Sequence, residues 1–198
     1  MKRIFLTILL GIGMPHLWAQ SESPIFQEVS LHIGQFPASL AVPRFSAIHP
    51  GLGVSAWKYW GQNPKHRMVQ ELTLNYFYHR NLQHAIQIYT EGGYRFQLDN
   101  GLQFTPLMIG GGYVMGISDL TALVADENGN YREKAFPVRH NWMISLGPEV
   151  GYFLPDVRDG KGLSVNLNYR IQVQGIFVQS TVPIVAYAPL WIRVGLPL

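Results

Sequence analysis

The sequence contains four acidic and four basic residues at positions that an alternating strand pattern would direct to one common side. The eight residues are Glu28, Glu71, Glu91, Glu149, Arg95, Arg139, Arg170 and Arg193. A charged side chain removed from water is costly unless an opposite charge lies beside it. We therefore predict that these acids and bases form a self-neutralising network inside the protein. The alternative is that they line a proton relay or a conducting path.

Three histidines form a second group whose side chains could bind a ligand. His79 and His84 flank residues 80–83, and His140 starts a later segment that we expect to lie at the same end of the molecule. Three imidazoles at one rim would suit a transition metal. The alternative, three unrelated interfacial histidines, requires no convergence of their side chains and is the interpretation that we favour. We accordingly predict no metal and no other cofactor.

Period-two alternation of apolar and polar residues defines the elements that must position these side chains. Successive residues of a β-strand point to opposite faces. In residues 163–174, every second residue is apolar and each residue between is polar. The segments with this alternation, or a weaker form of it, are 28–33, 50–59, 68–80, 85–98, 101–117, 138–154, 163–174 and 184–196. The chain is therefore predicted to form about eight antiparallel strands.

Glycine and proline interrupt three of these segments. The interruptions are Gly92-Gly93, Pro106 with Gly110-Gly111-Gly112, and Gly147-Pro148. Such residues mark bulges and sharp bends in strands. We predict bends at these points, as the closure of a small barrel requires.

Strand length and loop asymmetry distinguish a soluble sandwich from a membrane barrel. Most segments exceed the usual soluble strand of about 5 or 6 residues and reach the roughly 9 to 11 that cross a bilayer. Residues 98–101 predict a tight turn, whereas the longest connection, 118–137, falls on the opposite side. Short inner turns and longer outer loops are typical of outer-membrane barrels. The predicted fold is thus an all-β, antiparallel transmembrane β-barrel.

The N-terminal residues predict export. Lys2 and Arg3 precede an uncharged apolar stretch, and Ala19 offers a small residue for cleavage. We predict a signal peptide over residues 1–19 and an outer-membrane barrel domain over 20–198. Two of the 15 basic residues lie in this leader, so the remainder nearly balances the 12 acidic residues. A nucleic-acid partner is not expected, and the absence of cysteine excludes disulfides.

Two segments of the sequence resemble a known group of proteins. They are His49-Pro50-Gly51-Leu52-Gly53, and Asn63-Pro64-Lys65-His66 followed by Tyr76-Phe77-Tyr78-His79-Arg80, Gln83 and Tyr94-Arg95. Over residues 45–100 the chain resembles small Gram-negative outer-membrane barrels, similar in architecture to the OmpA, OmpX and OmpW types. The resemblance implies the fold and the outer membrane, and it implies no particular activity.

The enzymatic motif of related barrels is missing from the sequence. The lipid A deacylases resemble this chain in architecture and use a His-x-Ser segment, in which the histidine activates the serine. No histidine here is followed two residues later by serine. A nucleophile assembled between strands, for example Ser30 and His32 with Glu28, is an alternative.

We therefore predict a non-enzymatic barrel, acting as a structural element or as an accessory subunit of a surface or transport complex. Its expected partners are outer-membrane lipid and a larger membrane protein, which the 118–137 loop and the outer hairpins would contact. The alternatives are an enzyme that modifies lipid A or lipopolysaccharide, and a narrow pore for small solutes.

Overall fold

The structure is a computed structural model. It describes residues 25–37, 48–79, 83–118, 122–125, 129–134, 138–155, 162–178 and 182–198. The secondary structure of these residues is all β, as predicted. The strands are β1 (Glu28–Gln35), β2 (Pro50–Trp60), β3 (His66–His79), β4 (Gln83–Gln97), β5 (Leu102–Ser118), β6 (Ala122–Ala125), β7 (Tyr131–Lys134), β8 (Val138–Leu154), β9 (Leu163–Tyr169), β10 (Ile171–Val178), β11 (Val182–Tyr187) and β12 (Leu190–Pro197). The predicted leader, residues 1–19, lies outside the described residues.

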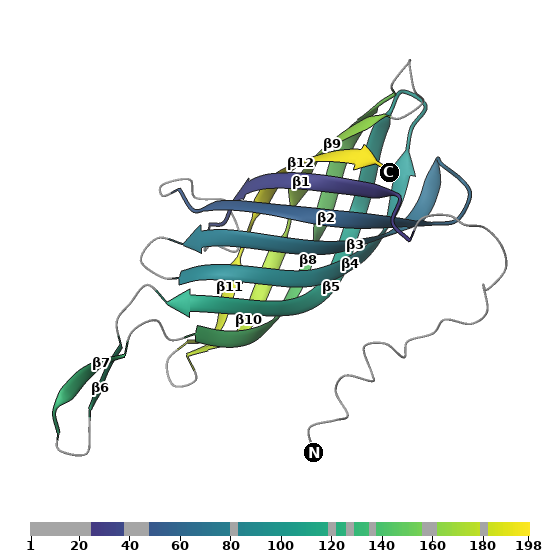
Figure 1. Ribbon diagram of the computed structural model, residues 1–198. Coiled ribbons are helices and arrows are strands. Elements are labelled where there is room, and N and C mark those ends of the chain that lie inside the picture. The colour runs from purple at the N-terminus through teal and green to yellow at the C-terminus, as the bar shows by residue number, and fades with distance from the viewer. Residues whose placement is uncertain are drawn as a thin grey trace, which may run out of the picture.

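Ten of these strands close into one antiparallel barrel whose wall has eight positions (Figure 1). Strands β1 to β5 pair in chain order, β5 pairs with β8, and β12 pairs with β1 to close the ring. The seventh wall position is shared by β9 and β10, which both pair with β8. The eighth is shared by β11 and β12. The prediction of an eight-stranded barrel is confirmed.

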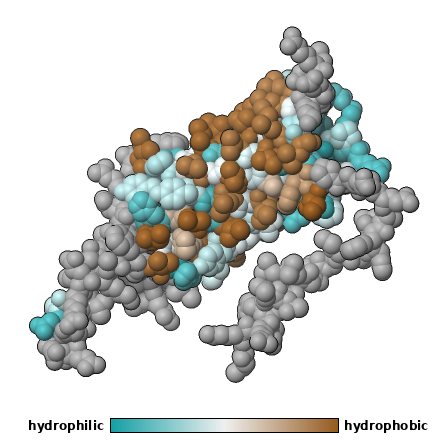
Figure 2. Space-filling view, in the orientation of Figure 1, coloured by the Kyte–Doolittle hydropathy of each residue, from teal (hydrophilic) through white to brown (hydrophobic). Residues whose placement is uncertain are grey.

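The barrel is polar inside and apolar outside. Along β1, Val29, Leu31 and Ile33 are 39%, 65% and 66% exposed, whereas the residues between them are buried. The same alternation runs through β3 and β8, and hydrophobic residues cover much of the wall in Figure 2. A wall of this polarity suits a surrounding of hydrocarbon, and the pairing of β1 with β12 closes the ring. No helix in the described part of the chain is long and apolar enough to cross a membrane.

Register shifts occur at the breaks predicted near Gly93, Pro106 and Gly147-Pro148, whereas Gly110-Gly111-Gly112 pair without a shift on both sides. The pairing of β5 with β8 shifts register between Thr105 and Met108, around Pro106. The pairing of β4 with β5 shifts beyond Gly93. At Gly93 a β-carbon would lie 2.6 Å from the carbonyl oxygen of Leu107, so only glycine fits this close approach of two strands.

The two ends of the barrel differ in their connections. The described chain ends meet at one end, where the backbone N–H of Leu198 donates to the carbonyl of Gln27 over 2.9 Å. The predicted tight turn at 98–101 lies at this end and contains Gly101 with φ +90°. The opposite end carries the 118–137 connection. The described part of that connection is a two-stranded hairpin, β6 paired with β7, which projects beyond the barrel (Figure 1).

Replacement of Gly93 by valine is expected to destabilise the barrel by about 1–3 kcal/mol, because the side chain would force two strands apart. The matched control is Gly92→Val, since the nearest atom to a β-carbon there is 3.8 Å away. The folded fraction is measured from the shift in gel migration on boiling. Equal folded fractions for the two variants would contradict the packing described for Gly93.

Candidate functional site: the charged core of the barrel

The centre of the barrel holds one carboxylate surrounded by three guanidinium groups. Glu149 on β8 accepts hydrogen bonds from Arg95, Arg170 and Arg193. The distances from Nη2 are 2.8 Å for Arg95 and 3.4 Å for Arg170. All four side chains are at most 2% exposed. Each side chain points inward from a different wall position, and strand register brings the four to one level.

Two further carboxylates neutralise the excess positive charge. Glu91 accepts from Nε of Arg170 over 2.9 Å, and both oxygens of Glu71 lie 3.3 Å from Nη1 of Arg193. The cluster thus balances three arginines with three glutamates. Such pairing offsets the large cost of burying each charge, whereas removal of one member would leave a charge buried without its partner.

Aromatic residues extend the cluster toward the end with the short turns. The guanidinium of Arg193 lies 3.9 Å from the centre of the Trp57 ring, and that of Arg95 lies 4.6 Å from it. Arg95 also donates to the Tyr59 hydroxyl over 3.2 Å, and this hydroxyl donates to Glu28. Glu28 therefore joins the network through Tyr59. These two aromatic members were not predicted, although their inward position follows from alternation in residues 50–59.

Arg139 lies apart from the other seven predicted members of the network. It is the second residue of β8, partly exposed, and pairs with Gly116 at the end that carries the 118–137 connection. The cluster around Glu149 lies ten residues further along the same strand. The alternating pattern predicted that Arg139 points inward. Its position near one end of the barrel, however, separates it from the glutamates of the cluster.

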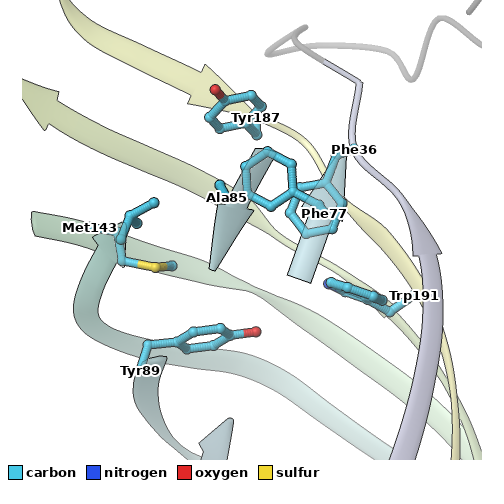
Figure 3. Packing of buried hydrophobic residues seen from close by; sticks show 8 residues of the cluster. Phe36, Phe77, Ala85, Tyr89, Met143, Tyr187 and Trp191 are labelled. Carbon is cyan, nitrogen blue, oxygen red and sulfur yellow. The ribbon is translucent and has the colours of Figure 1, made fainter. Parts of the chain in front are cut away.

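An aromatic cluster fills the lumen between the charged core and the end with the long connections (Figure 3). Phe36 stacks on Phe77 with ring centres 4.2 Å apart, and Trp191 meets Phe36 edge-on at 4.8 Å. Tyr187 packs against Phe77 and receives a hydrogen bond from Gln83. The remaining buried members are Ala85, Tyr89, Val114 and Met143. An interior of this width is expected to be filled by side chains.

The three predicted rim histidines do not converge. His79 points into the mouth, where its ring stacks on His49 at 3.8 Å. His84 and His140 lie on the outer face, hydrogen-bonded to Tyr76 and Tyr113. The residues that the structure describes contain no group of three or more His, Cys, Asp or Glu suited to a metal ion. The three-histidine metal site is therefore not formed, because strand alternation separates its members. Burial lowers the pKa of His49, which favours its neutral form.

The alternative nucleophile also fails to assemble. The hydroxyl of Ser30 lies 2.7 Å from that of Ser55 and accepts from the Trp57 indole. His32 lies 4.0 Å from Glu71, and its ring meets Trp191 edge-on. Both side chains are at most 3% exposed inside the barrel, so a lipid at the outer wall would not reach them.

Tyrosine–histidine pairs on the outer wall were not anticipated. Besides the two pairs named above, Nδ1 of His66 lies 2.8 Å from the Tyr94 hydroxyl near the opposite end. Each pair joins neighbouring strands diagonally, one partner lying two residues from the position directly opposite. The alternating pattern predicts that each of these tyrosines and histidines points outward. Which tyrosine meets which histidine depends on strand register, which was not predicted from the sequence.

Comparison with known proteins shows which solved structures have a similar architecture. No protein-family model matches the chain, and no curated protein sequence matches it significantly. Among solved structures it is similar to Neisserial surface protein A, with a TM-score of 0.55 and 17% identity over 86% of this chain and 96% of that one. The chain has the fold of the small outer-membrane barrels. Similarity at 17% identity does not extend to a shared activity.

Two other small barrels match with lower scores. The outer-membrane enzyme PagL matches with a TM-score of 0.44 and 11% identity, over 84% of this chain and 97% of that one. The Yersinia pestis outer-membrane protein Ail matches with a TM-score of 0.36 and 9% identity, over 87% and 99%.

Replacing Glu149 by glutamine is expected to destabilise the barrel by about 3–5 kcal/mol, because three buried guanidinium groups lose a shared counter-charge. The free energy of unfolding is measured by urea titration of the barrel in detergent micelles or liposomes. Arg139→Gln is the control and should cost far less, since Arg139 lies outside the cluster. A similar loss for both variants would show that the cluster has no special role in stability.

Proposed function

We propose that this protein is a non-enzymatic outer-membrane barrel that presents its outer connections at the cell surface, as a structural element or as an accessory subunit of a surface or transport complex. The observation that carries this proposal is the filled lumen. Ion pairs occupy its middle, and a layer of aromatic side chains lies between them and the end with the long connections.

A filled lumen argues against the pore alternative. A solute would have to separate Glu149 from its arginines and displace the stacked rings of Phe36 and Phe77. Disrupting a buried ion pair costs several kcal/mol, and the packed rings would have to leave their positions as well. The barrel wall is therefore better suited to anchoring the outer connections than to conducting.

The connections at one end are the parts best placed to contact another molecule. The hairpin of β6 and β7 projects beyond the barrel end (Figure 1). A barrel that presents such connections follows the general rule that binding residues lie on loops held by a scaffold. Support for the non-enzymatic interpretation comes from the side chains of Ser30 and His32, which are enclosed and engaged with other partners.

Gentle extraction of the tagged protein from its native membranes is expected to recover a stoichiometric protein partner, identified by mass spectrometry. A variant in which a short turn replaces residues 119–137 should lose this partner and retain the gel shift on boiling. Retention of the partner by this variant would argue against contact through the hairpin.

Two further measurements distinguish the alternatives. In planar bilayers the purified barrel is expected to give no discrete conductance steps, and a larger porin in the same bilayer serves as the positive control. Lipid A isolated from a deletion strain is expected to match that of the parent. Discrete steps would favour the pore, and an altered lipid A profile would favour the enzyme.

A further inference from the structure

The charged side chains of the barrel wall point inward, with one exception. In the ten described wall strands, the alternation of exposed and buried residues directs every glutamate and arginine toward the lumen. Lys58 on β2 follows the fully buried Trp57 and therefore points outward. A charge on the outer face of a membrane barrel is costly in hydrocarbon, so it requires a polar or anionic partner.

This partner is not supplied by the chain itself. Among the residues that the structure describes, no Asp or Glu forms an ion pair with Lys58. Its Nζ lies instead 4.4 Å from the centre of the Trp60 ring, two residues further toward the end of β2. Long lysine side chains near the ends of membrane-spanning elements bend toward the interface in this way. The ammonium group is thus carried to the level of Trp60.

The outer face changes in character at this level of the wall. Leu72 on β3 is 44% exposed, and the next outward residue toward the end of the barrel is the polar Gln70, directly opposite Lys58. One step further, Trp60 on β2 and Tyr94 on β4 follow on the same face. Tryptophan and tyrosine concentrate where hydrocarbon meets the lipid head groups. We therefore infer that the Lys58 ammonium lies at this interface.

The interface belongs to the leaflet beside the short turns. Trp60 is followed by the turn of residues 61–65, and Trp57 pairs with Glu28 where β1 begins. The C-terminus lies at this end of the barrel as well (Figure 1). In outer-membrane barrels the short turns face the periplasm. The adjoining leaflet is then the inner one, which consists of glycerophospholipids, and each of these carries an anionic phosphate diester between its acyl chains and its head.

We propose that Lys58 and the Trp60 ring form a binding site for the phosphate group of a glycerophospholipid in the inner leaflet. The ammonium has three N–H donors, and a phosphate oxygen beside Nζ would accept a charge-assisted hydrogen bond from it. The acyl chains would run from there along the apolar face of β2, past Ala56 and Val54. The proposal concerns the barrel wall and does not depend on the function proposed for the outer connections.

Two lipids that differ only in the phosphoglycerol group isolate this contact. The purified, folded protein in detergent is mixed with phosphatidylglycerol or with diacylglycerol of the same acyl chains. The fraction of protein carrying one lipid is measured by native mass spectrometry. Phosphatidylglycerol is expected to bind about fivefold better, which is the scale of one lysine at an anionic membrane surface.

Three variants test whether the preference depends on Lys58. Lys58→Gln is expected to abolish the preference for phosphatidylglycerol, and Lys58→Arg, which keeps the charge, should retain it. Lys65→Gln is the control, since Lys65 lies at the same end of the barrel but its Nζ is already 2.7 Å from Asp99; this variant should retain the preference. All three should show the gel shift on boiling, because both lysines lie outside the charged core.

Three outcomes would overturn the proposal. The unmodified protein would bind both lipids equally, or folded Lys58→Gln would keep the preference for phosphatidylglycerol. In the third case, Lys65→Gln would lose the preference as fully as Lys58→Gln, which would indicate a general effect of charge at this end. None of these measurements involves the hairpin, so failure of the function proposed above would leave the lipid site unaffected.

Discussion

The packing of three arginine side chains around the Glu149 carboxylate constrains how the strands of the barrel wall lie relative to one another. Each guanidinium comes from a different wall position, so the cluster links strands that are not hydrogen-bonded neighbours. Arg170 also donates to the carbonyl of Pro148 over 2.7 Å, at the break in β8. Its own backbone N–H bonds to Pro189 at the break between β11 and β12. The charges thus stabilise the points at which three wall positions bend.

The described core fills a barrel whose inward positions are largely polar. Backbone bonds determine the diameter of the barrel, but they do not determine what fills it. Ion pairs hold long side chains across the middle, and Phe36 enters from the connection after β1 to stack on Phe77. Gly51 leaves room for this ring, since a β-carbon there would come 2.5 Å from it. The two layers differ in chemistry, and both place packed side chains across the described part of the lumen.

Sequence alternation was sufficient to predict the fold and the orientation of most charged residues. It assigned Glu71, Glu91, Glu149, Arg95 and Arg193 to the interior, because period two depends only on neighbouring residues. It did not predict height along the barrel, which depends on strand stagger, and for this reason it grouped Arg139 with the core. The register between neighbouring strands could not be predicted from the sequence either. The tyrosine–histidine pairs and the contacts of Trp57 and Tyr59 were therefore found only in the structure. The predicted three-histidine site was wrong because its three side chains would have to lie on the same face of the wall and at the same height.

The pairing of β1 with β12 has a consequence for how the molecule is made. Glu28 lies opposite Pro197, so the contact that closes the ring joins residues at the two extremes of the described chain. Until β12 is in place, β1 presents an open edge, which cannot persist in hydrocarbon. Stepwise insertion of the strands in order of synthesis is therefore unfavourable. Closure of the ring thus depends on one pairing of very high sequence separation, between β1 and β12, and pairings of this kind form slowly.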